Sequence, residues 1–267
     1  MKKMDFTKIV ASGNDFVVVV APKRVVVPWR KLAQKICDRK YGAGADGLLV
    51  LEKSRIADIK MRIFNPNGSE AEMCGNGARS AALYLKSRKV KIETKAGIIV
   101  SRVCGENVRI KLTEPAHIKL NLPIKINNRM LRVNFIDTGV PHAVIFVADL
   151  DKIDVAWLGR QIRYHKRFAP RGANADFVEV AKSKEIKIRT YERGVEGETL
   201  ACGTGTVASA ILTVANMPHA KDGGYKINVL TKSGEALKVY FNKTNNKFND
   251  IWLEGKARVV YKGAYYV

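Results

Sequence analysis

The pattern of apolar and polar positions predicts two helices that lie in the interior. The segment 207–215, which follows Cys202, is apolar at almost every position and ends before Pro218. A helix that is apolar on all sides is buried, so we expect this one to form the centre of a core. A run of small and apolar residues also follows Cys74 as far as Leu85, and it predicts a second helix.

Most of the remaining segments are predicted to be strands. The exceptions are amphipathic helices: Leu32 and Ile36 share one face of a helix after Pro28, and Leu158 and Ile162 share one face of another. A sheet that wraps around a central helix accommodates both the many strands and the buried helix. We therefore predict a mixed α/β (α+β) fold in which a mostly antiparallel sheet or barrel surrounds each central helix.

The landmarks of the first half recur in the same order in the second half. The predicted strand 59–64 (IKMRIF) resembles 186–191 (IKIRTY), and a cysteine in a glycine-rich turn follows each of them. Further matched segments are 11–19 and 137–145, 42–54 and 172–183, and 94–97 and 231–234. A repeat of this length is too long for a solenoid and indicates a pair of similar domains.

The boundary between the two repeats is predicted near Pro115 and Pro123, which bracket a short polar connection. The last residues follow the completed second repeat, contain the predicted strand RVVY and are expected to return to the first domain. We therefore expect two pseudo-symmetric domains, residues 1–115 with 256–267 and residues 116–255. Each domain would present the N-terminus of its buried helix, and the cysteine on it, to the other domain.

Composition limits the classes of function. The chain has 267 residues, of which 46% are hydrophobic, enough for two domains of ordinary size. Its formal charge is +22, but the basic residues are spread along the chain and no nucleic-acid-binding motif accompanies them, so a solvated surface is favoured over a nucleic-acid site. No segment predicts a membrane span or an export signal, and four cysteines do not form a disulfide framework, so we expect a cytoplasmic protein.

The two glycine-rich turns, CGNG at Cys74 and CGTG at Cys202, carry the candidate chemistry. Unpaired N–H groups and the positive end of the helix dipole gather at a helix N-terminus, which suits an anion or a thiolate. Inversion of a carbon that carries an acidic hydrogen needs a base on one face and an acid on the other. Two equivalent thiols on facing domains meet that need, provided that one is a thiolate while the other stays a thiol.

The segments MCGNGAR at 73–79 and ACGTG at 201–205 resemble those of diaminopimelate epimerases. The likeness covers the whole chain, since GNDF, GADG, FNPNGSE, PH, NADF and YERG also occur in that family's order. The resemblance implies interconversion of LL- and meso-diaminopimelate, in lysine and peptidoglycan-precursor biosynthesis, without pyridoxal phosphate or metal. It also implies that the active site lies in the cleft between the two domains.

The resemblance also implies a role for individual residues. Cys74 and Cys202 would be the acid/base pair, and His142 and Glu192 would adjust the pKa values of the thiols. Residues that would contact the substrate are Asn14, Asn65, Gly75, Asn76, Asn174, Glu192, Arg193, Gly203 and Thr204. The chemistry agrees, because Arg193 can bind a distal carboxylate bidentately and asparagine amides can both donate and accept.

Two departures and several alternatives accompany this hypothesis. Val140 and Gly47 stand where members of the family carry Asn and Gln, so the substrate is less firmly predicted than the chemistry. A racemase of proline, hydroxyproline, histidine or another amino acid is one alternative, although proline-type relatives usually have His in place of Asn76. A basic nucleic-acid-binding protein is another. Cys37 and Cys104 have no counterpart in the other repeat and are predicted to be packing residues; the oligomeric state stays open, a homodimer included.

Overall fold

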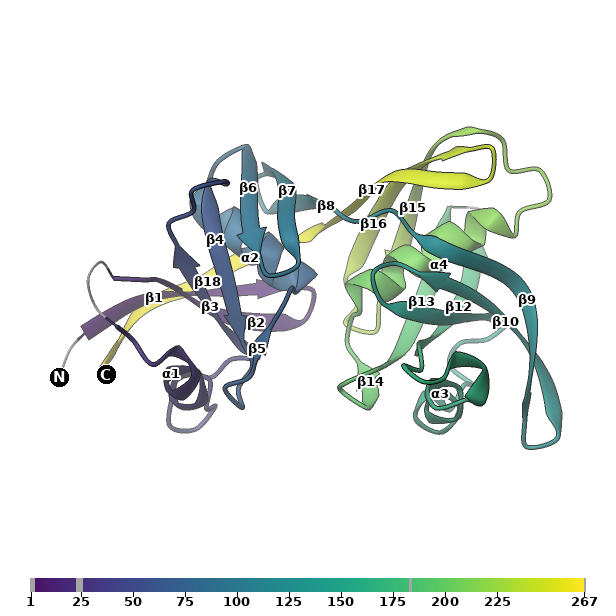
Figure 1. The fold of residues 1–267 in the computed structure, drawn as a ribbon, viewed down its shortest axis with the longest axis horizontal. Helices are drawn as coiled ribbons and strands as arrows, with labels where there is room; N and C mark the ends of the chain where they lie inside the picture. Colours follow the sequence, from purple (N-terminus) through teal and green to yellow (C-terminus); the bar gives the residue numbers. More distant parts are fainter. Residues whose placement is uncertain (1–2, 23–25, 183, 267) are drawn as a thin grey trace. The chain divides into compact units, whose positions relative to one another are not determined.

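The computed structural model describes residues 3–22, 26–182 and 184–266, which belong to two compact units (Figure 1). Unit 1 comprises Met1–Lys111 and Glu254–Val267, and unit 2 comprises Leu112–Leu253. Strands make up 50% of the chain and helices 17%, so the predicted mixed fold rich in strands is confirmed. The terminal residues of the predicted domain ranges, 1–2 and 267, lie outside the described residues.

Unit 1 contains nine strands and two helices within the described residues. The strands are β1 (Lys3–Ala11), β2 (Asn14–Val20), β3 (Gly47–Glu52), β4 (Ile59–Phe64), β5 (Glu70–Ala71), β6 (Lys89–Thr94), β7 (Gly97–Cys104), β8 (Asn107–Lys111) and β18 (Arg258–Tyr266). The helices are α1 (Trp29–Ile36) and α2 (Gly75–Leu85). The final strand β18 pairs with β1, so the end of the chain returns to the sheet of the first residues.

Unit 2 repeats this composition in the part of the chain that the structure describes. Its strands are β9 (Ala116–Ile126), β10 (Arg129–Asp137), β11 (Pro141–Phe146), β12 (Asn174–Lys182), β13 (Glu185–Glu192), β14 (Gly197–Thr199), β15 (Gly223–Leu230), β16 (Ala236–Thr244) and β17 (Lys247–Lys256). Its helices are α3 (Val155–Arg163), the short 3₁₀ helix η1 (Lys166–Phe168) and α4 (Gly203–Ala215). Strand β17 contains the boundary between the units, at Leu253 and Glu254.

The strands of the two units pair in the same order and with the same directions. In unit 1, β18–β1, β1–β2, β3–β4, β6–β7 and β7–β8 are antiparallel, whereas β2–β3 and β4–β6 are parallel. In unit 2, β9–β10, β10–β11, β12–β13 and β15–β16 are antiparallel, whereas β11–β12 and β13–β15 are parallel. The short strands β5 and β14 lie against β4 and β13, which are equivalent positions. The repeat in the sequence is therefore a repeat of topology.

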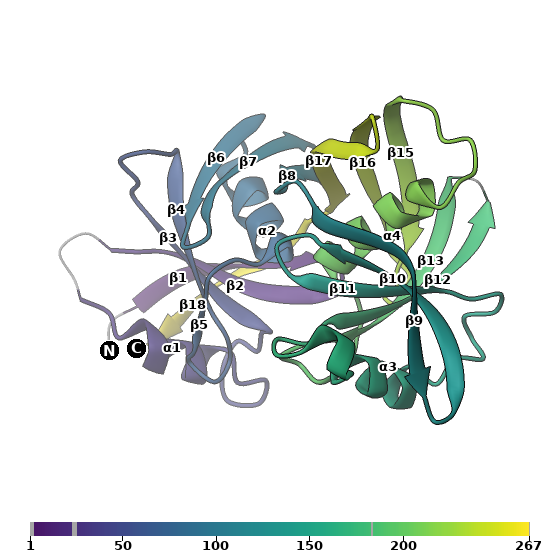
Figure 2. The same ribbon diagram turned by 45° about the vertical axis from the view of Figure 1, so that its right-hand side comes forward.

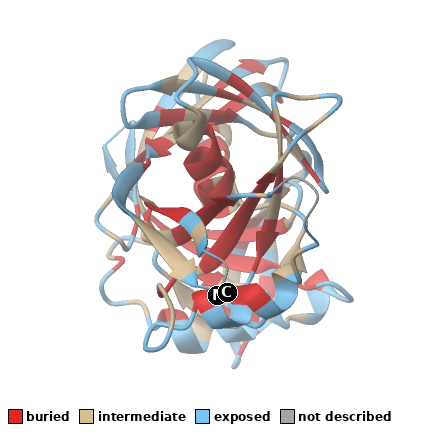
Figure 3. Cartoon of the chain, turned by 90° about the vertical axis from the view of Figure 1, so that its left-hand side faces the viewer, coloured by how far each residue is buried: buried red, intermediate tan, exposed pale blue. Residues whose placement is uncertain are grey.

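Each unit is built around one buried helix (Figures 1 and 2). In α4 the residues from Gly205 to Val214 are all buried, and the helix packs against β10, β11, β12, β13, β15 and β16. In α2 the buried residues run from Asn76 to Ala82, and Figure 3 shows the surrounding strands with their exposed outer positions. The prediction of a buried helix at the centre of each unit is confirmed. It rested on the rule that a helix without a polar face has protein on every side.

The helices α1 and α3 lie outside the strands of their own units (Figure 1). Leu32 and Ile36 of α1 are buried in an apolar cluster of unit 1, and Ile162 of α3 is buried in the corresponding cluster of unit 2. Cys37 belongs to the first cluster, as predicted, and burial raises the pKa of its thiol to about 12. Cys104 is exposed, so its prediction as a packing residue is wrong: it pairs with Asn107 at the tip of the β7–β8 hairpin, where no second layer covers it.

A carboxylate joined to two cations holds the strand that leads to each cysteine. Glu70 of β5 accepts from Arg62 Nε at 2.7 Å and pairs with Lys95 at 2.9 Å. Glu198 of β14 accepts from Arg189 Nε at 2.7 Å and pairs with Lys232 at 2.7 Å. These charge-assisted contacts hold β5 and β14, the strands that precede the two cysteines, in the same way.

Candidate functional site

Both cysteines occupy the N-cap position of a central helix. Cys74 precedes α2 and Cys202 precedes α4, each in an extended backbone conformation. The carbonyl oxygens of Cys74 and Cys202 accept the first helical hydrogen bonds, from Ala78 N at 2.8 Å and from Thr206 N at 2.9 Å. The sulfur of Cys74 also accepts from Gly77 N at 3.4 Å. Each thiol therefore lies where helix N–H groups and the helix dipole favour negative charge.

The glycine after each cysteine opens the first helical turn. Gly75 and Gly203 are the first residues of α2 and α4, so their N–H groups are among those that a helix leaves without an intrahelical acceptor. Gly205 is required for a different reason, since a Cβ at this position would collide with Asp176 Oδ1. The carboxylate of Asp176 thus lies directly against the first turn of α4.

In unit 1 the structure brings together two of the predicted substrate residues. Asn76 Nδ2 donates to Asn14 Oδ1 at 2.7 Å, and Asn14 Nδ2 donates to Asp46 Oδ2 at 3.0 Å. Asn76 Oδ1 accepts from Arg79 Nη2 at 2.6 Å. Arg79 is fully buried on α2, one turn after Asn76. Asn14 and Asn76 are therefore members of one hydrogen-bonded chain beside Cys74.

Asn65, the third predicted amide of unit 1, is exposed and belongs to the turn between β4 and β5. Its N–H donates to Ser69 O at 2.8 Å, its carbonyl accepts from Gly68 N at 2.9 Å, and its Nδ2 donates to Ser69 Oγ at 2.9 Å. The tight turn expected of Asn-Pro-Asn-Gly is present. Among the described residues, Asn65 makes no hydrogen bond to Asn14 or Asn76.

In unit 2 the predicted residues His142 and Asn174 lie side by side on the parallel strands β11 and β12. His142 Nδ1 is 2.7 Å from Asp176 Oδ2, and both side chains are fully buried. Asp176 Oδ1 accepts from Thr190 Oγ1 at 2.7 Å. The other ring nitrogen of His142, Nε2, lies 3.4 Å from Asn174 Nδ2.

The side-chain amide of Asn174 makes its hydrogen bonds to other residues of unit 2. Its Oδ1 accepts from Arg193 N at 2.7 Å, and its Nδ2 donates to Pro141 O at 3.3 Å and lies near His142 Nε2. The guanidinium of Arg193 donates to Arg171 O at 3.4 Å. The buried amide of Asn174 is thus joined to the side chain of His142 and to the backbone of Pro141 and Arg193.

Burial and two carboxylates keep Cys202 in its thiol form. The side chain is 7% exposed, and burial together with Glu192 and Asp176 raises the pKa of Cys202 well above its ordinary value. Thr204 Oγ1, 3.4 Å from the sulfur, acts weakly in the opposite direction. Burial also raises the pKa of Glu192, with a further contribution from the carboxylate of Asp176. Cys202 therefore holds its proton more firmly than a free cysteine does.

Sequence reasoning missed four polar residues at these helix ends: Asp46, Arg79, Asp176 and Thr190. The two aspartates occupy the same place in the repeated segments GAGAD and GANAD, which was a usable signal. Arg79 lies inside the quoted motif MCGNGAR, but its burial follows only from the packing of α2. Thr190 gave no signal, because its role depends on the pairing of β13 with β12 at Asp176.

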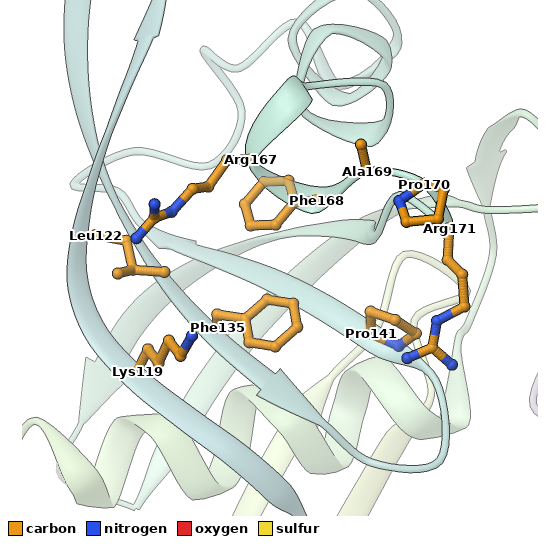
Figure 4. Close-up of a pocket in the computed structure, with 9 residues that line it drawn as sticks. All are labelled: Lys119, Leu122, Phe135, Pro141, Arg167, Phe168, Ala169, Pro170 and Arg171. Atoms are coloured by element: carbon orange, nitrogen blue, oxygen red, sulfur yellow. The ribbon is translucent and has the colours of Figure 1, made fainter.

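Other features of the described residues add no candidate site of this kind. No cluster of three His, Cys, Asp or Glu side chains suited to a metal occurs among them. A search of the same residues for a helix long and apolar enough to cross a membrane gives no candidate. A cavity of about 270 Å³ in unit 2 is lined by Phe135 and Phe168, with Arg167 and Arg171 at its rim (Figure 4). It includes Pro141 but none of the predicted catalytic side chains.

Comparison with known proteins matches the chain to enzymes that carry the same name. The family model described as diaminopimelate epimerase matches residues 6–118 and 134–260. The diaminopimelate epimerase of Aquifex aeolicus (strain VF5) is 39% identical over 277 residues, covering 97% of each chain. That of Methanocella arvoryzae is 38% identical and covers 98% of this chain and 97% of the relative.

Solved structures share the fold at lower identity. A PhzF-family phenazine biosynthesis protein of Bacillus anthracis superposes over 100% of both chains with a TM-score of 0.77 at 20% identity. A hydroxyproline epimerase from Agrobacterium vitis gives 0.71 at 14% identity, covering 99% of this chain and 91% of that one. These structures establish the fold, and the full-length match in sequence, together with the paired N-cap cysteines, establishes that the chain belongs to the diaminopimelate epimerase family.

Proposed function

We propose that the protein interconverts LL-2,6-diaminopimelate and meso-2,6-diaminopimelate by a two-base thiol mechanism. The observation that carries this proposal is the repeated placement of a cysteine at the N-cap of a buried central helix. Membership of the diaminopimelate epimerase family names the substrate. The reaction is an isomerisation of a small molecule, which belongs to lysine and peptidoglycan-precursor biosynthesis.

In the proposed reaction, one thiolate removes the α-proton and its carbon retains the bonding electron pair as a carbanion. The charge spreads into the α-carboxylate, where the N–H groups of Gly75, Asn76, Gly203 and Thr204 stabilise it. The opposite thiol then gives its proton to the other face of the same carbon. One proton leaves and one arrives, so the reaction needs no oxidant, and the two cysteines exchange protonation states.

The roles of the individual residues follow from this scheme. In this proposal the two epimerase domains are residues 1–115 with 256–267 and residues 116–255, and the substrate binds in a cleft between them. Cys74 and Cys202 exchange the proton, and His142 and Glu192 adjust the pKa values of the thiols. The substrate-binding set is Asn14, Asn65, Gly75, Asn76, Asn174, Glu192, Arg193, Gly203 and Thr204. Neither pyridoxal phosphate nor a metal ion takes part, so turnover should be insensitive to phenylhydrazine and to EDTA.

The decisive experiment is incubation of the reduced protein with LL-diaminopimelate in D₂O. We expect formation of the meso isomer with deuterium at the inverted α-carbon, detected by NMR and chiral chromatography. A panel of proline, hydroxyproline and histidine serves as the substrate control. Absence of exchange with diaminopimelate, or faster exchange with one of the control amino acids, would reject the proposed substrate.

We also propose that the protein works in the cytoplasm as a homodimer. Strand β18 of unit 1 exposes Val259, Val260 and Tyr261, an apolar row that a second copy could cover. The variant Val260→Lys should then be monomeric by light scattering, whereas Val20→Lys, at an exposed position of β2, should keep the native mass. A monomeric parent protein, or equal masses for both variants, would contradict the dimer. Cell fractionation tests the location.

A further inference from the structure

The hydrogen-bonded chain beside Cys74 has one direction from end to end. It begins at Arg79 Nη2, which donates to Asn76 Oδ1 at 2.6 Å, and continues through Asn76 Nδ2 to Asn14 Oδ1 at 2.7 Å. It ends where Asn14 Nδ2 donates to Asp46 Oδ2 at 3.0 Å. All four residues belong to unit 1, although they come from α2, β2 and the segment before β3.

The chemistry of the two ends fixes the orientation of the two amides. A guanidinium has donors only, so the atom of Asn76 that faces Arg79 must be oxygen. A carboxylate has acceptors only, so the atom of Asn14 that faces Asp46 must be nitrogen. A rotation of either amide by half a turn would set two donors or two acceptors against each other. The charges at the ends therefore select one orientation out of two for each amide.

Burial and neighbouring contacts hold both ends in place. Arg79 is fully buried and also donates from Nη2 to Ser12 Oγ at 2.7 Å. Asp46 Oδ1 accepts from Arg39 Nη2 at 2.6 Å, and Asp46 Oδ2 also accepts from Asp15 N at 3.2 Å. A buried charge without a partner is costly, so Arg79 cannot turn away from the chain at little expense, whereas Asp46, whose side chain is 35% exposed, is held by its contacts with Arg39 and Asp15.

Each amide keeps one N–H group beyond the bond that it makes in the chain. An amide nitrogen carries two hydrogens, and Asn14 and Asn76 each use one of them in the contacts that the structure describes. The second N–H of each is available to an acceptor, and Asn76 lies in the first turn of α2, beside Cys74. A carboxylate oxygen is the acceptor that this arrangement favours, because the neighbouring helix N-terminus also attracts negative charge.

We propose that Arg79 and Asp46 are positioning residues that orient the amides of Asn14 and Asn76 so that both present N–H donors to a carboxylate of the substrate. This rests on the proposed function, which places the substrate at Cys74. Arg79 and Asp46 act through the two asparagines and touch no reacting atom. The consequence is specificity: a substrate whose carboxylate is replaced by a carboxamide offers a weaker acceptor and would be discriminated against.

The test uses two variants and two matched controls on the full chain. Asp46→Ala removes the acceptor at one end, and Arg79→Lys replaces the planar donor at the other. Ser80→Ala is the control on the same helix, since Ser80 Oγ donates only to the backbone oxygen of Asn76, at 3.0 Å. Arg39→Gln is the control for the lost ion pair, because it removes a partner of Asp46 but leaves the acceptor for Asn14.

The first measurement does not depend on activity. Side-chain amide signals of Asn14 and Asn76 are recorded by ¹⁵N NMR and assigned with Asn14→Asp and Asn76→Asp. We expect slow hydrogen exchange of both amides in the parent protein and in Ser80→Ala. In Asp46→Ala, exchange at Asn14 should be faster by at least about tenfold, because its bonded N–H loses the acceptor. Unchanged exchange would overturn the orientation by Asp46, whether or not the protein epimerises diaminopimelate.

The second measurement is the ratio of kcat/KM for diaminopimelate to that for its monocarboxamides. Asp46→Ala and Arg79→Lys should lower this ratio by about tenfold, chiefly through KM for diaminopimelate, while both controls keep the parent ratio. A merely structural role would lower activity on all substrates alike and leave the ratio unchanged, which would overturn the proposal. If the parent protein fails to turn over diaminopimelate, the proposed function fails, and the exchange experiment still decides the orientation.

Discussion

The N-termini of α2 and α4 are the same structural device with different polar surroundings. In unit 1, the buried cation Arg79 lies beneath the first turn of α2 and orders two amides. In unit 2, Thr204 and Val207 occupy the positions that correspond to Asn76 and Arg79, counted from each cysteine. Near the first turn of α4 lie Asp176, which corresponds to Asp46 of unit 1, and Glu192, and both carboxylates raise the pKa of Cys202.

This difference shows which parts of the two repeats were free to change after the duplication. The repeat preserved the strand pairings, the central helix, the N-cap cysteine and the Arg–Glu–Lys contact before it, all of which the frame of each unit requires. The side chains around the first turn of the central helix differ between the two units. The proposed two-base reaction needs unlike protonation states on its two thiols, and the surroundings of Cys202 favour the thiol there. In this interpretation Cys202 is the group that donates a proton to the substrate carbon after the α-proton has been removed.

The largest effect is expected from removal of either thiol. Cys74→Ala and Cys202→Ala should each lower epimerisation by at least about a thousandfold, because each removes one of the two proton carriers. Cys104→Ala, at an exposed position, is the matched control and should retain parent activity. Chiral chromatography of the product measures the effect. If either cysteine variant kept more than a tenth of the parent rate, that thiol would not be required and the two-base mechanism would be rejected.

Mild oxidation should inactivate the protein by joining Cys74 to Cys202. In the proposed reaction the two thiols flank one carbon, so they must come close enough to be linked. Peptide mapping by mass spectrometry would identify the bond, and reduction should restore activity. Full activity after oxidation, with both thiols unlinked, would contradict their placement on opposite sides of one substrate.

The two central helices should differ in their contribution to stability. Leu212 of α4 is fully buried, whereas Leu83 of α2 lies near the end of its helix and is partly exposed. Leu212→Ala should lower the free energy of unfolding by about 2–5 kcal/mol, and Leu83→Ala by about half of that or less. Chemical denaturation of both variants measures the difference. Equal losses would show that α2 is buried to its end as tightly as α4.

The smallest expected effect concerns the pH dependence of Cys202. Removal of the Glu192 charge by Glu192→Gln should lower the pKa of Cys202, because a nearby carboxylate disfavours the thiolate. The pH profile of Cys202 alkylation by iodoacetamide should therefore move to lower pH, as followed by mass spectrometry. Glu179→Gln, which removes a carboxylate paired with Lys187, should leave the profile in place. A shift to higher pH would refute the assigned cause.

Local sequence patterns predicted the elements that depend on near neighbours in the chain. The buried helix α4 follows from its lack of a polar face, and the N-cap cysteines follow from the glycine-rich turns before two apolar runs. The misassigned Cys104 shows the limit of this approach, because alternation in a strand does not tell whether a second layer covers it. Asn174 was predicted as a substrate contact, and its burial among internal partners was not foreseen.

The sequence by itself determined the doubled order of elements, the two central helices, the cysteines at their N-termini and the family. Only the tertiary structure decided which polar side chains surround each thiol. Asn76 meets Asn14 because α2 packs against β2, and His142 meets Asp176 because β11 pairs with β12. Periodicity records which side of an element is apolar. The partner of a buried polar group depends on long-range pairing, which local composition does not encode.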